Sequence, residues 1–152
     1  VSYAIHMLEH YYDPFHKSLY KRIKYLFKVF GFCYHIDLHT MPSKALLNFK
    51  KEPDIVLGDN FGKSCSLRLM NYLQNVFKEN GFIVEVNNPY AGGFITRNYG
   101  NPFKGVHTIQ IEINRKIYMD ENKLSLKNIE ILQEIFAKIF NNLELSEKIA
   151  AE

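Results

Sequence analysis

The chain has 152 residues, of which 47% are hydrophobic and 23% charged, and it carries a formal net charge of +3. This length favours one domain with a buried core, and the composition is that of an ordinary soluble globular protein. No apolar run approaches the ~18 residues of a membrane-spanning helix, and the first residues lack the pattern of a secretory signal, so no membrane partner is expected.

Charge and cysteine content also bear on partners and compartment. The basic residues are scattered, except for a group within residues 17–24 that falls on the polar side of one expected helix. A solvated helix face explains this group better than a nucleic-acid partner, which we do not expect. Cys33 and Cys65 have neither CxxC spacing nor a disulfide framework, so we expect reduced thiols in a cytoplasmic protein.

The N-terminal part of the chain predicts two helices. Asp13 can cap a helix and Pro14 suits the first helical position, so the longer helix is expected to begin there. Its expected core face consists of Phe15, Leu19, Ile23, Leu26, Phe27 and Phe30. Residues 2–12 predict a separate short helix. His6 and Glu9 there have a spacing that can hold zinc, and polar residues on a helix surface are the alternative.

Residues 32–39 alternate between apolar and polar side chains, which is typical of a strand. Asp37 and His39 share the polar face, about 7 Å apart along the strand, and a loop is expected from Thr40 onward. Polar side chains at the carboxyl end of a strand are where α/β proteins bind ligands. The alternative is that Asp37 and His39 only make structural hydrogen bonds.

The middle of the chain predicts a strand at 55–58, a turn at 59–62, a helix opened by Ser64 or Ser66, and a strand at 82–86. The residues expected on the core face of this helix are Leu67, Met70, Leu73, Val76 and Phe77. The second strand leads into a long glycine-rich loop. A glycine-punctuated loop with aromatic and charged residues is more often a functional site than a spacer.

A strand is expected at Val106–Asn114, and alternation divides its residues between two faces. His107 and three isoleucines share one face, and Glu112 lies on the other face between Gln110 and Asn114. A carboxylate is costly to bury without purpose, and burial would raise its pKa toward values suited to proton transfer. A structural hydrogen-bond network is the alternative.

Ser125 is expected to cap a last helix. The residues expected to face inward are Ile129, Leu132, Phe136, Ile139 and Phe140. Strands separated by amphipathic helices predict an α/β fold, a three-layer sandwich around a mixed sheet. We expect residues 1–143 to form a single domain and residues 144–152 to form a polar tail.

Five motifs resemble those of the N-formylglutamate amidohydrolases, also called N-formylglutamate deformylases. They occur in the family's order as HYYDPFH (His10–His16), IDLHTMPS (Ile36–Ser43), GDNFGKSC (Gly58–Cys65), NNPYAGGFITRNYG (Asn87–Gly100) and GVHTIQIEINRKIYMDE (Gly105–Glu121). The resemblance implies a zinc-carboxypeptidase-like fold, of the phosphorylase/hydrolase-like kind. It also implies zinc-dependent hydrolysis of an N-formyl or N-acyl amino acid, such as N-formylglutamate, to formate and glutamate in histidine breakdown.

The resemblance also implies roles for individual residues. His39 would be a zinc ligand, supported from behind by Asp37. Glu112 would be the carboxylate that handles the proton of the attacking water. Tyr99 and His107 would hydrogen-bond the substrate or the developing oxyanion, with His107 counted among the catalytic residues.

Two arginines are candidates to hold the carboxylates of a small anionic substrate through forked contacts. Arg97 is favoured over Arg115 because it lies in the loop where Gly92 and Gly93 let the backbone come close to a ligand. For Arg115, the alternative is a surface ion pair with an acidic residue at 120–121.

Family members extend further on the N-terminal side, where a Pro-His-Ser-Gly-like motif lies near the metal, and no stretch of this chain matches that motif. We therefore expect a truncated chain that holds the C-terminal portion of the family domain, with His6 and Glu9 as candidate substitute ligands. The rival expectation is an inactive remnant that binds a small anion or another protein. An exposed sheet edge would favour association into a homo-oligomer.

Overall fold

The computed structural model describes residues 2–46 and 50–150, and side chains up to residue 143. Its α-helices, its π-helical turn (η1) and its 3₁₀ helices are α1 (Ser2–Met7), η1 (Leu8–Tyr12), α2 (Asp13–Phe30), η2 (Ser43–Leu46), α3 (Leu67–Glu79), α4 (Phe94–Tyr99), η3 (Pro102–Lys104), η4 (Arg115–Ile117) and α5 (Ile129–Ala150). Its strands are β1 (Cys33–Met41), β2 (Ile55–Gly58), β3 (Val84–Val86), β4 (Val106–Asn114), β5 (Met119–Asp120) and β6 (Ser125–Leu126). The backbone is helical to Ala150, so helix α5 enters the segment that was expected to be a tail.

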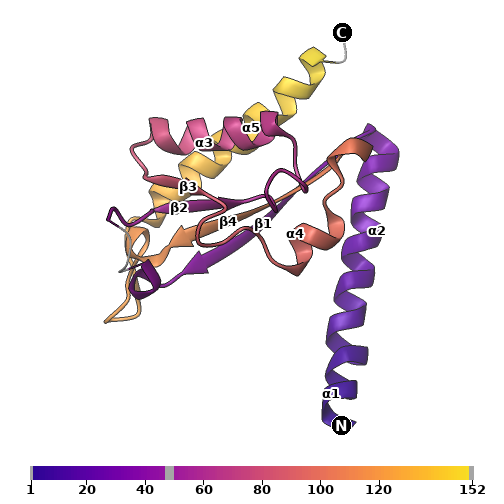
Figure 1. The fold of residues 1–152 in the computed structure, drawn as a ribbon, viewed down its shortest axis with the longest axis horizontal. Helices are drawn as coiled ribbons and strands as arrows, with labels where there is room; N and C mark the ends of the chain where they lie inside the picture. The colour runs from indigo at the N-terminus through magenta and orange to yellow at the C-terminus, as the bar shows by residue number, and fades with distance from the viewer. Residues whose placement is uncertain (1, 47–49, 151–152) are drawn as a thin grey trace.

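The first four strands form one mixed sheet in the order β1-β4-β2-β3. Strand β4 is parallel to β1 and antiparallel to β2, and β2 is parallel to β3. Helices α3 and α5 lie on one face of this sheet and α4 lies on the other (Figure 1). The predicted α/β sandwich with a mixed sheet is therefore confirmed.

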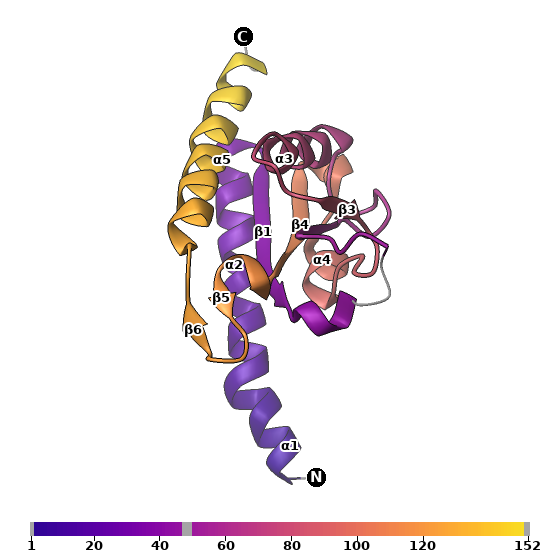
Figure 2. The same ribbon diagram turned by 90° about the vertical axis from the view of Figure 1, so that its left-hand side faces the viewer.

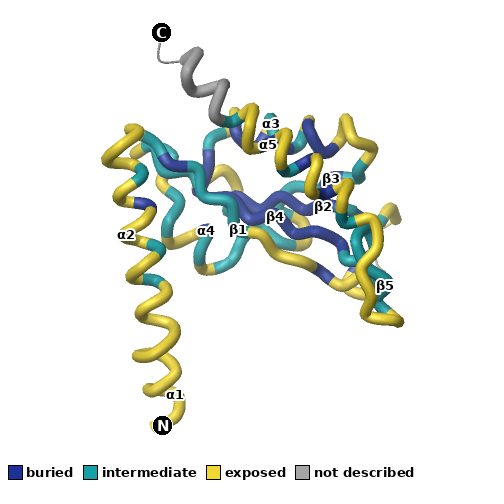
Figure 3. Tube along the Cα trace, turned by 180° about the vertical axis from the view of Figure 1, so that it is seen from behind, coloured by how far each residue is buried: buried dark blue, intermediate teal, exposed yellow. Residues whose placement is uncertain are grey.

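The face of the sheet toward α3 and α5 holds most of the hydrophobic core. Its central residues are Ile55, Leu57, Ile109, Ile111, Leu73, Phe77 and Ile139, all of them fully buried. Strands β2 and β4 are buried along most of their length (Figure 3). Alternation in β4 places its isoleucines on this side, together with His107 at the start of the strand, so this face supplies much of the folding free energy.

The other face of β4 is polar although it is also buried. Thr108, Gln110, Glu112 and Asn114 are each at most 6% exposed. Buried polar groups require hydrogen-bond partners, and these come from neighbouring strands and loops. This face therefore depends on specific contacts, unlike the apolar one.

The N-terminal helices differ from the prediction because they form one continuous rod. Helix α2 begins at Asp13 as predicted, but Tyr12 and Asp13 have right-handed helical backbone angles, so it continues directly from η1 without a side-chain cap. The π turn η1 precedes Pro14, with the N–H of Asp13 bonded to the carbonyl of Leu8. Because proline has no N–H, a locally widened turn accommodates it within a helix. Figure 2 shows α1 and α2 as one rod that extends beyond the sheet.

Several expected core positions are exposed. Of the six apolar residues expected inward on α2, only Ile23 is buried, and Phe30 is 62% exposed. The reason is that α2 lies beside the sheet and contacts it mainly through the edge strand β1. Leu67 on α3 is 73% exposed because it occupies the first turn of that helix. Phe140 on α5 is also half exposed.

Two boundaries predicted at strand and helix ends are wrong. Strand β1 continues through Thr40 to Met41, because pairing with β4 extends to Asn114. Ser125 does not cap a helix; it pairs with Asp120 in the short β5–β6 hairpin, and α5 begins four residues later. By contrast, Ser66 caps α3 through its hydroxyl, as one of the two predicted options.

The state of the two thiols and the length of the helices can be read from the structure. Cys33 and Cys65 are both buried and free. Burial and the neighbouring Asp59 carboxylate raise the pKa of Cys65 to about 12, so this thiol stays protonated and unreactive. Within the described part of the chain, no helix is both long enough and apolar enough to cross a membrane.

Candidate functional site

The candidate catalytic residues meet where β1 and β4 run side by side. His39 on β1 is the cross-strand partner of Glu112 on β4, so both side chains leave the sheet on the same face. His39 Nδ1 lies 3.5 Å from Glu112 Oε1, and His39 Nε2 lies 3.2 Å from Asp37 Oδ2. The structure thus brings together three residues that the sequence singled out, with the imidazole between two carboxylates.

The surroundings of Glu112 make it a stronger base than an exposed glutamate. The residue is 6% exposed, and burial raises the pKa of its carboxyl group, although the positive potential of His39 and the hydrogen bond from Gln110 act in the opposite direction. Burial has this effect because charge is less well stabilised away from water. The expected rise in pKa is confirmed, and it suits a group that accepts and returns a proton near neutral pH.

Gln110 connects Glu112 to the glycine-rich loop. Its Nε2 donates to Glu112 Oε1 at 2.8 Å, and its Oε1 accepts the backbone N–H of Gly93, also at 2.8 Å. A Cβ at position 93 would lie 3.3 Å from this oxygen, so glycine suits this approach. From the sequence, alternation along β4 identified Gln110 only as an amide beside the carboxylate. Its partner on a distant loop gave no sequence signal.

The loop is held in place by the turn after β2. Asp59 Oδ1 accepts from Asn87 Nδ2 at 2.8 Å, and Asn87 Oδ1 accepts the backbone N–H of Asp59 at 3.0 Å. A Cβ at Gly58 would lie 2.6 Å from the backbone nitrogen of Gly92, so the two segments can cross only because position 58 is glycine. The turn and the loop therefore form one unit that fixes where the loop crosses the polar face.

The two arginines lie on different elements beside this face. Arg97 on α4 is exposed, and its Nη1 donates to the carbonyl of Gly92 at 3.2 Å. Arg115 follows β4, and its Nε donates to Oγ1 of Thr40 at 3.3 Å. The charge of Arg115 also helps to lower the pKa of Glu112. A guanidinium carries five N–H groups, so one such hydrogen bond does not exhaust its capacity for a carboxylate.

Tyr99 lies between α2 and the polar face of the sheet. Its hydroxyl oxygen is 2.6 Å from Nδ1 of His16 and 3.3 Å from the backbone oxygen of His16. Its ring packs edge-on against His35, with 6.2 Å between the ring centroids. Burial raises the pKa of Tyr99, which keeps its hydroxyl group protonated. These contacts give the HYYDPFH motif a role in docking α2, and a contact of Tyr99 with substrate stays a prediction.

The structure separates His107 from this group. Its side chain lies on the opposite face of β4 from Glu112, where Nδ1 accepts the backbone N–H of Ser66 at 3.0 Å. Its ring lies 5.3 Å from that of Tyr34. The structure therefore places His107 on the face opposite Glu112, as the alternation along the strand predicted, and a catalytic role for His107 stays a prediction.

His6 and Glu9 are exposed at the far end of the N-terminal rod, where the ring of His6 stacks on that of His10 at 4.1 Å. Figure 1 shows α1 projecting away from the sheet. The structure therefore does not bring His6 or Glu9 to His39. Both are polar residues on a helix surface, as the alternative interpretation had it.

The fit of a zinc ion can be judged from the donors beside His39. Zinc prefers imidazole and carboxylate ligands, and Asp37, His39 and Glu112 supply both types. However, both ring nitrogens of His39 face carboxylate oxygens, whereas a ligand histidine must present a lone pair to the metal. Among residues 2–46 and 50–143, no group of three His, Cys, Asp or Glu side chains could hold a metal ion. The donor types fit zinc, but they do not make a complete coordination sphere.

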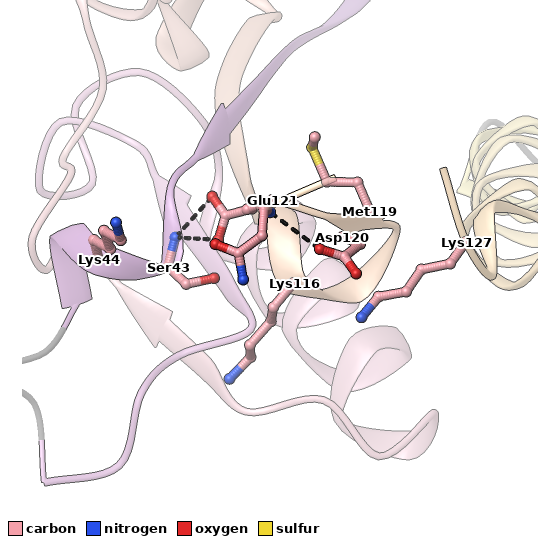
Figure 4. Close-up of a pocket in the computed structure, with 8 residues that line it drawn as sticks. Ser43, Lys44, Lys116, Met119, Asp120, Glu121 and Lys127 are labelled. Atoms are coloured by element: carbon pink, nitrogen blue, oxygen red, sulfur yellow. Dashed lines mark hydrogen bonds between the residues drawn. The ribbon is translucent and has the colours of Figure 1, made fainter. Parts of the chain in front are cut away.

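A pocket of ≈ 360 Å³ lies beyond the carboxyl ends of β1 and β4, around the β5–β6 hairpin (Figure 4). Glu121 closes part of it by accepting the backbone N–H of Ser43 with both oxygens, at 3.1 and 3.3 Å. Hydrogen bonds from Ser43 lower the pKa of Glu121, with a further contribution from the charge of Arg115. The charge of Arg115 thus acts on Glu121, whereas the surface ion pair given as the alternative for Arg115 stays a prediction. Neither His39 nor Glu112 lines the pocket, so it is separate from the polar face.

Comparisons with known proteins bear on the family of the chain. The N-formylglutamate amidohydrolase family profile matches residues 2–119. The chain is 36% identical over 118 residues to an N-formylglutamate deformylase of Pseudomonas putida, covering 76% of this chain and 44% of that protein. It is 34% identical over 110 residues to one of Pseudomonas aeruginosa, covering 71% and 41%. The chain thus spans less than half the length of these relatives.

A solved structure shares the fold. The N-formylglutamate amidohydrolase from Ralstonia eutropha JMP134 superposes with a TM-score of 0.89 and 26% sequence identity, over 97% of this chain and 55% of that one. Together with the family match over residues 2–119, this likeness agrees with the motif order in the sequence. The chain belongs to the N-formylglutamate amidohydrolase family.

Proposed function

We propose that this chain hydrolyses the N-formyl amide of a small anionic amino acid such as N-formylglutamate, releasing formate and glutamate. The single observation that carries the proposal is the pair formed by Glu112 and His39 across adjacent parallel strands. A buried carboxylate with a raised pKa next to an imidazole is the arrangement that amide hydrolysis needs for proton transfer. The relatives named as N-formylglutamate deformylases support the choice of substrate.

In this proposal Glu112 accepts a proton from the attacking water and returns it to the leaving amine. The water oxygen forms a bond to the formyl carbon, the C–N bond breaks, and the amine nitrogen takes the proton. His39 lies 3.5 Å from Glu112 Oε1, and Asp37 orients its ring from the other side. Arg97 and Arg115 hold the carboxylates of the substrate by charge-assisted hydrogen bonds.

We propose zinc as the cofactor and His39 as the ligand that this chain contributes. The donor chemistry of His39 supports this assignment. The buried, free thiols are consistent with a reducing compartment, and we propose the cytoplasm.

The test is formate release from N-formyl-L-glutamate by the purified chain, with a chelator and then with added zinc. Turnover should disappear with the chelator and return with zinc. Glu112→Gln should lower turnover by at least about 100-fold, the scale of a lost proton-transfer group. Glu134→Gln, at an exposed position of α5, is the matched control and should not change it. Turnover of Glu112→Gln close to that of the wild type would overturn the assignment.

A second candidate function is binding of the same anion without turnover. It is favoured by the absence of a three-ligand metal group among the described residues. Under this alternative, calorimetry should detect binding of N-formylglutamate that weakens on Arg97→Ala, while formate release stays at the background rate at every zinc concentration.

A further inference from the structure

One peptide group of the glycine-rich loop is held from both sides. The carbonyl of Gly92 accepts from Arg97 Nη1 at 3.2 Å, and the N–H of Gly93 donates to Gln110 Oε1 at 2.8 Å. Both atoms belong to the same planar peptide unit, so the two hydrogen bonds together fix its orientation. A candidate substrate-binding arginine and a buried strand residue therefore contact one rigid plane.

The orientation of the Gln110 side chain follows from its partners. A backbone N–H can only donate, so the atom that faces Gly93 is the carbonyl oxygen of the Gln110 amide. Its NH₂ group then faces Glu112, where Nε2 lies 2.8 Å from Oε1. Gln110 is 5% exposed, and a buried amide that lost either partner would leave a polar group unsatisfied. Both contacts therefore stabilise a single rotamer.

We propose that Gln110 is a positioning residue that holds the carboxylate of Glu112 and couples it to the loop contacted by Arg97. The inference rests on the proposed function, in which Glu112 transfers the proton. The hydrogen bond from Gln110 restrains rotation of the carboxylate and occupies Oε1, so Oε2 is the oxygen that this bond leaves for the reacting water. The same amide restrains the peptide between Gly92 and Gly93, so substrate binding at the loop and orientation of Glu112 depend on one side chain.

The experiment replaces Gln110 with methionine, which has a similar length and cannot form either hydrogen bond. Gln133→Met, at an exposed position of α5, is the matched control. In Gln110→Met, hydrogen exchange of the Gly93 amide should accelerate about five- to tenfold, as expected for loss of one hydrogen bond. The kcat for formate release should fall at least about tenfold, whereas the control should change neither quantity.

A double-mutant cycle separates positioning from a general effect on folding. In a Glu112→Gln background, Gln110→Met should cost little further kcat, because the group that it orients is gone. An equal loss of kcat in both backgrounds overturns the proposal, and so does an unchanged Gly93 exchange rate. Gly93→Ala is the second variant: its Cβ would crowd Gln110 Oε1, and it should show the same dependence on Glu112.

Failure of the proposed function gives a different result from failure of this inference. If the wild-type chain shows no turnover with zinc, the proposed function fails, and the crystal structure of Gln110→Met decides the inference. A rotated Glu112 carboxylate together with a displaced Gly93 supports positioning by Gln110. A carboxylate that keeps its 3.5 Å distance to His39 Nδ1 overturns it.

Discussion

The two faces of strand β4 are built from alternate residues of one nine-residue segment, and they are stabilised by different interactions. The face toward α3 and α5 carries Ile109 and Ile111, which are fully buried and need only shape and apolar contact. The opposite face carries Gln110 and Glu112, which are nearly as buried and depend on named partners. Apolar packing tolerates many exchanges of similar volume, whereas a buried polar network fails when one member is lost.

This difference separates stability from function within the strand. Burial of isoleucine is favourable on its own, so the apolar face stabilises the sheet that positions the polar one. Burial of a carboxylate is unfavourable until hydrogen bonds offset it. Burial of Glu112 therefore lowers the free energy of unfolding, and the same burial raises the pKa of its carboxyl group. The following predictions test this contrast, from the largest expected change in the free energy of unfolding to the smallest.

Ile111→Ala tests the apolar face. Ile111 is fully buried against α3 and α5, so its truncation leaves a cavity and should lower the free energy of unfolding by about 2–5 kcal/mol. Leu38→Ala, at a position that is 54% exposed on β1, should change it by less than about 1 kcal/mol. Urea denaturation measures both. Equal effects would mean that the apolar core does not lie where β4 places it.

Gly58→Ala tests the close crossing of the two segments that support the polar face. The new Cβ would lie 2.6 Å from the nitrogen of Gly92 and 2.9 Å from the carbonyl oxygen of Tyr90, which are backbone atoms and cannot move cheaply. We expect a loss of about 1–3 kcal/mol and faster amide exchange at Gly93. Gly81→Ala, in open space at φ +84°, should lose about 1 kcal/mol through backbone strain and leave Gly93 unchanged. The opposite order would argue against the crossing.

Ser66→Ala tests the helix that covers the apolar face. The hydroxyl of Ser66 accepts the N–H of Leu69 at 3.3 Å as the N-cap of α3, so its removal should cost about 1 kcal/mol. Ser64→Ala is the matched control, because the hydroxyl of Ser64 is buried without a hydrogen-bond partner among the described atoms. Its removal should not lower stability. Thermal unfolding followed by circular dichroism compares the two variants.

Glu112→Gln tests the cost of the polar face through its dependence on pH. Since burial raises the pKa of Glu112 in the folded state, the folded chain binds this proton more tightly than the unfolded chain does. The contribution of Glu112 to stability is therefore present below its unfolded pKa and is lost as the pH rises through its folded pKa. In the presence of a chelator, Glu112→Gln should gain stability relative to the wild type as the pH rises from the pKa of an unfolded glutamate, about 4.3, through the raised pKa of the folded chain. The exposed control Glu134→Gln should show no such gain, and an advantage that shrinks with rising pH would contradict the raised pKa.

The elements that could be predicted from the sequence are those with a local signal. Strand β4 was predicted with its observed bounds, and alternation alone placed Glu112 on the face opposite the isoleucines. Asp37 and His39 were likewise placed together on the polar face of β1. The family motifs predicted the family, which the profile match over residues 2–119 confirms, and the roles that they suggested for single residues stay predictions. These successes share one feature: a period of two residues encodes the face of a strand.

The failures concern contacts between distant segments. Asp13 and Pro14 predicted the start of α2, but not its continuity with the preceding helix, because the π turn that joins them has no simple sequence signature. The exposure of Phe30 follows from where α2 docks, which periodicity does not determine. The hydrogen bond between Gln110 and Gly93 joins residues seventeen positions apart, and no spacing rule predicts it.

The register of β1 and β4 has a consequence for protein engineering. Because His39 and Glu112 are paired residues of neighbouring strands, their separation is set by the strand spacing of roughly 4.8 Å, which varies little while the sheet is intact. Loops, in contrast, accept insertions and substitutions readily. The chain therefore offers a modular scaffold. The segment around Arg97 can be redesigned to bind a different acidic substrate while the hydrogen bond between Gly93 and Gln110 is kept. The sheet then holds the His39 imidazole and the Glu112 carboxylate in the same relative position.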